Sequence, residues 1–91
     1  MPRFVIERDL PGAGKMSPAE LKALSQKSVG IMRDLGPDIQ WDHSYVTDDK
    51  IFCVYMADDP DAIKEHARMA GLPVDSIHRV GTVIDPTTAE G

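Results

Sequence analysis

The spacing of apolar and polar residues predicts three strands in the first two thirds of the chain. Phe4–Arg8 begins with an aromatic and β-branched run too short for a helix, and the Pro11–Gly14 loop ends it. Two further runs, Ile39–Val46 and Ile51–Ala57, flank the polar stretch Thr47–Lys50, whose aspartates favour a turn. These two runs are therefore predicted to form a hairpin.

Two helices are predicted, one before and one after this hairpin. Ser17 followed by a proline and then by Glu20 is the pattern of a capping box, and apolar residues at the helical period predict a helix over Pro18–Leu35. The acidic residues around Pro60 repeat the cap-then-proline pattern, and the second helix is expected to end at Gly71.

A fourth strand is predicted within the β-rich segment Ile77–Ile84. The order strand, helix, strand, strand, helix, strand is the split βαβ arrangement of ferredoxin-like α+β domains, with two helices on one face of an antiparallel sheet. We expect one such domain over residues 1–85 and a flexible tail over residues 86–91. The other face of the sheet would be solvated or covered by the sheet of a second copy, in a homodimer.

The alternation of side chains along strands predicts which residues share each face of the sheet. A turn at Asp48 and Asp49 would place Val46 opposite Ile51 and, two residues further along, Ser44 opposite Cys53. The helix side is then expected to hold Trp41, His43, Tyr45, Phe52 and Val54. The open side is expected to collect Glu7, Asp42, Ser44, Cys53 and Tyr55.

Composition excludes several classes of protein. The chain has 91 residues, of which 42% are hydrophobic and 27% charged, values that fit one soluble globular domain. Its net charge of −5 and scattered basic residues argue against a nucleic-acid partner. No apolar run reaches the length of a membrane helix and no apolar signal opens the chain, so we expect a cytoplasmic protein without a membrane partner. The single cysteine cannot form an intramolecular disulfide.

Several segments together resemble a known family. They are Arg3–Gly12, Trp41–Lys50, Cys53–Tyr55, Glu65–Arg68 and Gly71–Pro73. In these segments the chain is similar to a family of small bacterial proteins, long described as a domain of unknown function, that includes a nickel-binding protein. The resemblance spans nearly the whole chain. It implies a ferredoxin-like homodimer that binds Ni²⁺ or a similar divalent metal ion in sequestration or homeostasis, without catalysis.

The three histidines are the candidate metal ligands, because neutral imidazole suits Ni²⁺ near pH 7. His66 could anchor a surface site, although its helical position also fits a structural role facing the sheet. His78 follows Asp75 by three residues, and the pair could share an ion or be simply exposed. His43 could be a metal ligand or a hydrogen-bonded structural residue.

A second hypothesis places a ligand cavity, in a small enzyme or binding protein, on the open side of the sheet at a dimer interface. Glu7 and Asp42 would form an acid/base pair there, or else ion pairs with arginines. Cys53 would be a nucleophile in this hypothesis, although a small buried residue is the simpler interpretation. Ser44 and Tyr55 would complete the lining.

Overall fold

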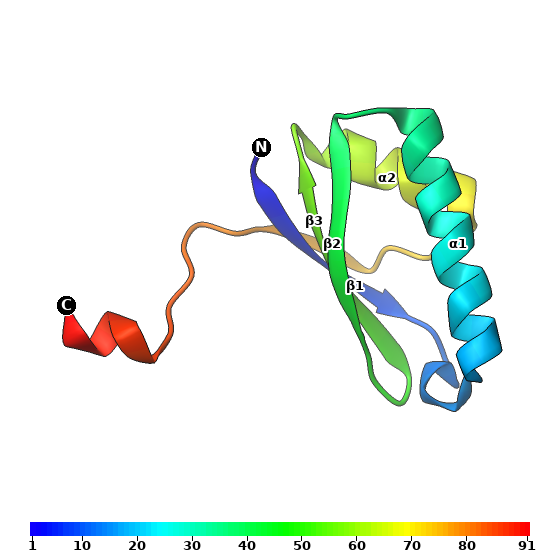
Figure 1. The fold of residues 1–91 in the computed structure, drawn as a ribbon, viewed down its shortest axis with the longest axis horizontal. Helices are drawn as coiled ribbons and strands as arrows, with labels where there is room; N and C mark the ends of the chain where they lie inside the picture. The colour runs from blue at the N-terminus through cyan, green and yellow to red at the C-terminus, as the bar shows by residue number, and fades with distance from the viewer.

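The computed structural model describes residues 1–91 and contains the predicted α+β order. Strands β1 (Arg3–Asp9), β2 (Ile39–Val46), β3 (Lys50–Ala57) and β4 (Ser76–Arg79) form one antiparallel sheet in the order β2-β3-β1-β4. Helices α1 (Pro18–Leu35) and α2 (Pro60–Ala70) lie on the same face of this sheet (Figure 1). The predicted βαββαβ arrangement is confirmed.

Both helices begin at the predicted caps. The Ser17 hydroxyl accepts a hydrogen bond from the Glu20 amide, and the Glu20 carboxylate accepts one from the Ser17 amide, which completes the capping box. Asp59 caps α2 by accepting from the amide of Asp61 at 2.7 Å. Helix α2 ends at Gly71, whose φ of 68° is the left-handed conformation that glycine adopts without a Cβ clash.

The loop after β1 packs against the tip of the β2–β3 hairpin through a short 3₁₀ turn, η1 (Ala13–Lys15). The Gly12 amide donates to the Asp49 carboxylate, and the Gly14 amide donates to the Asp48 carbonyl, each at 3.0 Å. A Cβ on Gly14 would stand 2.9 Å from the Asp48 Cα, so only glycine fits this contact. Packing therefore explains Gly14, whereas Gly12 has a φ of 79°, the left-handed conformation that favours glycine.

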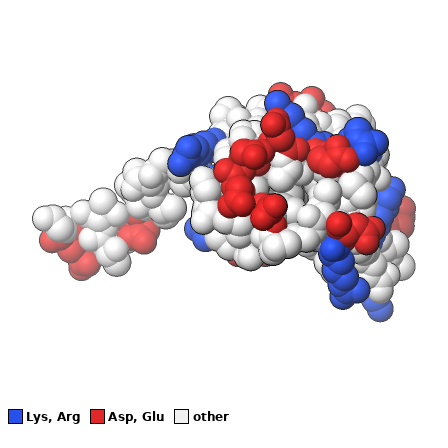
Figure 2. Space-filling view, turned by 90° about the horizontal axis from the view of Figure 1, so that it is seen from above, with Lys and Arg blue, Asp and Glu red and all other residues white.

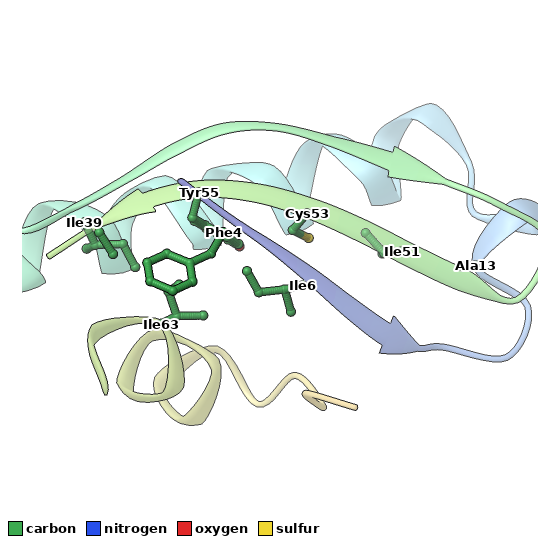
Figure 3. Packing of buried hydrophobic residues seen from close by; sticks show 9 residues of the cluster. Phe4, Ile6, Ala13, Ile39, Ile51, Cys53, Tyr55 and Ile63 are labelled. Carbon is green, nitrogen blue, oxygen red and sulfur yellow. The ribbon is translucent and has the colours of Figure 1, made fainter. Parts of the chain in front are cut away.

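The hydrophobic core lies between the sheet and the two helices (Figure 3). Its central side chains are Phe4 and Ile6 from β1, Cys53 and Tyr55 from β3, and Ile63 from α2. Ile6 and Ile63 are completely buried. Arg8, at the next core-facing position of β1, is also buried, with 1% of its surface exposed.

The fourth strand is shorter than predicted. It ends at Arg79, and the Val80 amide still donates to the Arg3 carbonyl at 2.8 Å. The segment from 81 to 85 then leaves the body of the molecule (Figure 1). Val83 and Ile84 are 67% and 76% exposed, so their β-branched side chains, which suggested a strand, find no neighbouring strand in this chain. A 3₁₀ turn, η2 (Pro86–Glu90), closes the chain. The flexibility expected of residues 86–91 stays a prediction.

Acidic side chains gather at the end of the molecule where α1 leads into β2 and β3 leads into α2 (Figure 2). The Asp58 amide donates to the Asp38 carbonyl at 3.2 Å, which joins these two connections. No helix has both the length and the apolar character needed to cross a membrane.

Candidate functional site

The register of the hairpin decides which side chains meet on each face. Val46 lies opposite Ile51 and Ser44 opposite Cys53, as predicted. Continuing the same register would set Asp42 opposite Tyr55, but Trp41 lies there instead. The register shifts between Trp41 and His43, which leaves Asp42 as an extra, unpaired residue of a β-bulge. The bulge reverses the alternation along β2.

The predicted open side was wrong for three of its five residues. Cys53 and Tyr55 belong to the buried core under the helices, as Figure 3 shows, and Ser44 pairs with Cys53 on that side. The Ser44 hydroxyl accepts a hydrogen bond from the Trp41 indole at 2.9 Å. The sequence could not decide which face of β3 is buried, because both alternating sets of its side chains are largely apolar. The buried set is the one with the smaller side chains, and it contains Cys53 and Tyr55.

The predicted faces of Phe52, Val54, His43 and Tyr45 change accordingly. Phe52 and Val54 lie on the open side, next to β1 residues Glu7 and Val5 respectively. His43 pairs with Val54 and Tyr45 with Phe52, so both β2 side chains share that open face. Trp41 alone keeps its predicted helix side, because it precedes the bulge.

Glu7 and Asp42 do not form the predicted acid/base pair. Glu7 is on β1, and β3 separates it from Asp42 on β2. The partner of Glu7 is Lys50, whose Nζ lies 3.2 Å from Glu7 Oε2 and 2.8 Å from Asp9 Oδ1. The Asp9 carboxylate and then the Glu7 carboxylate raise the pKa of Lys50. An ion pair thus accounts for Glu7, with a lysine in place of the predicted arginine.

Asp42 instead orients His43. Asp42 Oδ2 lies 2.7 Å from His43 Nδ1, and His43 Nε2 lies 3.2 Å from the Tyr45 hydroxyl. The rings of His43 and Tyr45 meet edge to face, with centroids 5.0 Å apart. The side chains of His43 and Asp42 are 45% and 40% exposed, so solvent reaches this group. A neutral imidazole bonded through Nδ1–H to a carboxylate directs its Nε2 lone pair outward.

His78 lies on the same face at the opposite edge of the sheet. Pairings place His43 beside Val54, Val54 beside Val5, and Val5 beside His78, in one row across all four strands. Neighbouring strands are roughly 4.8 Å apart, so the two histidine backbones are separated by about 14 Å. Asp75, the predicted partner of His78, accepts a hydrogen bond from the Asp9 amide through its carboxylate.

His66 lies inside the molecule and has no exposed surface. Its Nε2 is 3.0 Å from the Ser28 hydroxyl, its ring stacks obliquely near Tyr55 with centroids 5.5 Å apart, and Nδ1 has no partner. Burial and then the positive charge of Arg8 lower the pKa of His66, while the hydrogen bond with Ser28 opposes them. In this position His66 is a structural histidine. Its role as a metal ligand stays a prediction, and it would require the core to open so that a metal ion could reach the ring.

Arg8 was not among the sequence candidates. Its Nη1 donates to the Pro73 carbonyl at 2.7 Å and its Nη2 lies 3.5 Å from the Tyr55 hydroxyl, while Nε has no partner. Burial and then Cys53 raise the pKa of Tyr55 to about 12, although Arg8 acts in the opposite direction. The signal in the sequence is the alternation Phe4, Ile6, Arg8, which continues the core-facing series by one residue.

This chain matches a known protein family over most of its length. The model of a family described as nickel responsive protein SCO4226-like matches residues 4–80. The chain belongs to the SCO4226-like family. Its fold is similar to the crystal structure of SCO4226 from Streptomyces coelicolor A3(2), with a TM-score of 0.75 and 16% identity, over 90% of this chain and 99% of that chain. No curated protein matches the sequence.

The family is described as nickel responsive, and the resemblance expected from the sequence is confirmed. Within one chain, no three His, Cys, Asp or Glu side chains converge in a way that could hold a metal ion. The exposed imidazoles on the open face are His43, with Asp42 behind it, and His78 across the row. The Glu7 and Asp9 carboxylates of this face are paired with Lys50.

Proposed function

We propose that two copies of this chain bind Ni²⁺ between their open sheet faces, with His43 of one copy and His78 of the other as ligands. The observation that carries the proposal is the pairing of His43 Nδ1 with Asp42 Oδ2 at 2.7 Å on an exposed face. Metal-binding histidines commonly donate their second ring N–H to a carboxylate, which fixes the tautomer and strengthens the ligand. The family description supports nickel as the metal.

The row across the sheet supports a shared site. Three strand spacings separate His43 from His78, a distance that one ion cannot bridge within one chain. Two sheets that pack face to face lie about 10 Å apart. A twofold axis parallel to the strands would set β2 of each copy over β4 of the other. His43 of each copy would then face His78 of the other copy. Two equivalent sites per dimer would follow.

The apolar character of the open face supports the dimer itself. Val5, Phe52 and Met56 are only half-buried there, and Tyr45 is 61% exposed. Covering this surface would remove apolar area from water, a gain that matters for a domain of 91 residues with a small core. On Ni²⁺ binding, the Tyr45 hydroxyl would release His43 Nε2 to the metal.

Two imidazoles completed by water would suit reversible binding, so we propose sequestration of nickel in the cytoplasm, without catalysis, as the role. Nickel accepts such nitrogen and oxygen donors in tetragonal geometry. His66 and Asp75 take no part in this proposal, because the first is buried and the second accepts from a backbone amide.

The experiment is calorimetric titration of tag-free, metal-stripped protein with Ni²⁺, with Zn²⁺ and Co²⁺ for comparison. One Ni²⁺ per chain is expected, together with a dimeric mass in light scattering. His43→Gln and His78→Gln should each abolish binding, and Asp42→Asn should weaken it by roughly 10–100-fold. His66→Gln is the matched control and should bind like the original chain. Binding should also fall near pH 5, as imidazole protonates.

Three results would contradict the proposal. A monomer in the presence of Ni²⁺ would exclude the shared site, as would full binding in both His43→Gln and His78→Gln. Loss of binding in a folded His66→Gln variant would move the site into the core.

A further inference from the structure

A pocket lies on the other side of the sheet from the proposed metal sites. It is partly enclosed between the sheet and α1 and has a volume of about 70 Å³. Leucines 21, 24 and 72 form apolar walls, and the polar groups include Arg8, Ser25 and Tyr55. None of the twelve lining residues is an aspartate or a glutamate. The pocket therefore contains a fixed positive charge and no carboxylate.

The charge of Arg8 lacks a counter-ion within the chain. Its guanidinium stays protonated at any ordinary pH, and only 1% of the residue is exposed. None of the four ion pairs of the molecule includes Arg8. A buried charge without an opposite charge is strongly unfavourable, so a group that neutralises it would gain considerable interaction energy.

The titratable groups around Arg8 do not neutralise it in their usual forms. Tyr55, with its pKa raised to about 12, is a neutral phenol near pH 7. His66 from α2 is neutral or positive and never negative. Ser28 from α1 carries no charge, and the remaining neighbour, Cys53 from β3, is neutral as a thiol.

One edge of the Arg8 guanidinium is buried and has no close hydrogen-bond partner within the chain. Nη1 is committed to the Pro73 carbonyl at 2.7 Å, whereas Nε has no partner and Nη2 has only the long 3.5 Å contact with Tyr55. Nε and Nη2 lie on the same edge of the guanidinium, and two parallel N–H groups on such an edge match the two oxygens of a carboxylate.

We propose that this pocket binds a small carboxylate anion, held in bidentate fashion by the Nε and Nη2 groups of Arg8. The Tyr55 hydroxyl would donate its proton to one carboxylate oxygen, and the leucine walls would contact a short alkyl group. The volume of about 70 Å³ is small, so the proposed ligand is an acid of only a few non-hydrogen atoms. A single guanidinium suits a carboxylate better than a phosphate, which has a larger charge to neutralise.

The chain offers its own reporter for the test. Trp41 is the only tryptophan and lines the pocket, so its fluorescence can follow binding in the intact protein. Formate, acetate and propionate are titrated at constant ionic strength, with chloride and inorganic phosphate for comparison. A saturable fluorescence change is expected with the carboxylates alone. At about ten times the dissociation constant, the unfolding temperature should rise by roughly 5–10 °C.

Arg8→Met should weaken carboxylate binding by at least about tenfold, because it removes two charged hydrogen bonds. Arg68→Met is the matched control, since Arg68 is exposed and paired with Glu65 outside the pocket. In case Arg8→Met does not fold, nuclear magnetic resonance of the original chain gives a second test. The Arg8 Nε–H signal should shift on addition of acetate, while that of Arg68 should not.

The proposal is overturned if no carboxylate changes the fluorescence, or if folded Arg8→Met binds as the original chain does. A larger response to phosphate than to acetate would overturn the assignment to carboxylates. Thiolate absorbance at neutral pH that disappears in Cys53→Ala would identify Cys53 as the counter-ion and would also refute it. The nickel titration tests the opposite face of the sheet, so the two proposals can fail separately.

Discussion

The buried position of His66 predicts a specific dependence of stability on pH. The ordinary pKa of histidine is about 6.5 in the unfolded chain. Burial and the nearby Arg8 charge lower the pKa of His66 in the native state. As pH falls through this unfolded value, the unfolded chain takes up a proton that the native protein does not. The free energy of unfolding should therefore decrease below about pH 6.5 and be fully recovered above it.

The size of the effect follows from one proton. Proton linkage allows at most about 1.4 kcal/mol per pH unit for a single group. Between about pH 6.5 and about pH 5, His66 can thus remove up to about 2 kcal/mol of unfolding free energy. Such a loss is a large part of the stability of a small domain.

Urea denaturation at closely spaced pH values tests this prediction. His66→Gln keeps an amide that can bond with Ser28 but removes the titration, so its stability should change less between about pH 7 and about pH 5. His43→Gln is the control, since His43 is exposed on the open face. Parallel pH profiles for the original chain and His66→Gln would refute the reasoning, because another group would then bind the proton.

Four further substitutions test the packing and the helix caps by urea denaturation at one pH. Ser17→Ala removes the cap of α1 and should lower the unfolding free energy by about 1 kcal/mol. Gly30→Ala should raise it by about 0.5–1 kcal/mol, because a Cβ there meets nothing within 4 Å. Gly14→Ala should lower it, since its Cβ would stand 2.9 Å from the Asp48 Cα; an equal effect at both glycines would contradict this pair of predictions. Ile63→Ala should lower it by about 2–5 kcal/mol, and a loss under about 1 kcal/mol would show that the core collapses around the cavity.

The order and bounds of most elements could be predicted from the sequence, because their signals are local. The capping box at Ser17 starts α1 at the predicted residue, and the glycines after each helix end it there. The spacing of apolar residues distinguished strands from helices, because it too is a local signal. The last strand was predicted too long, because β-branched residues such as Val83 and Ile84 indicate strand propensity but not whether a neighbouring strand is present to pair with them.

The candidate site depended on long-range packing, which the sequence does not record directly. Residues on both faces of β3 are apolar, so their pattern is nearly the same in either orientation. His43 lies on the open face because it pairs with Val54, on the side of β3 that the helices do not cover. One extra residue at Asp42 then reverses the alternation of β2 and leaves Trp41 under the helices. Sequence alone determined the α+β order and the helix caps, and it supplied the histidines that are the candidate metal ligands. Tertiary structure decided that His66 and Arg8 are buried and that His43 and His78 share a row, because burial and register arise from contacts between distant segments.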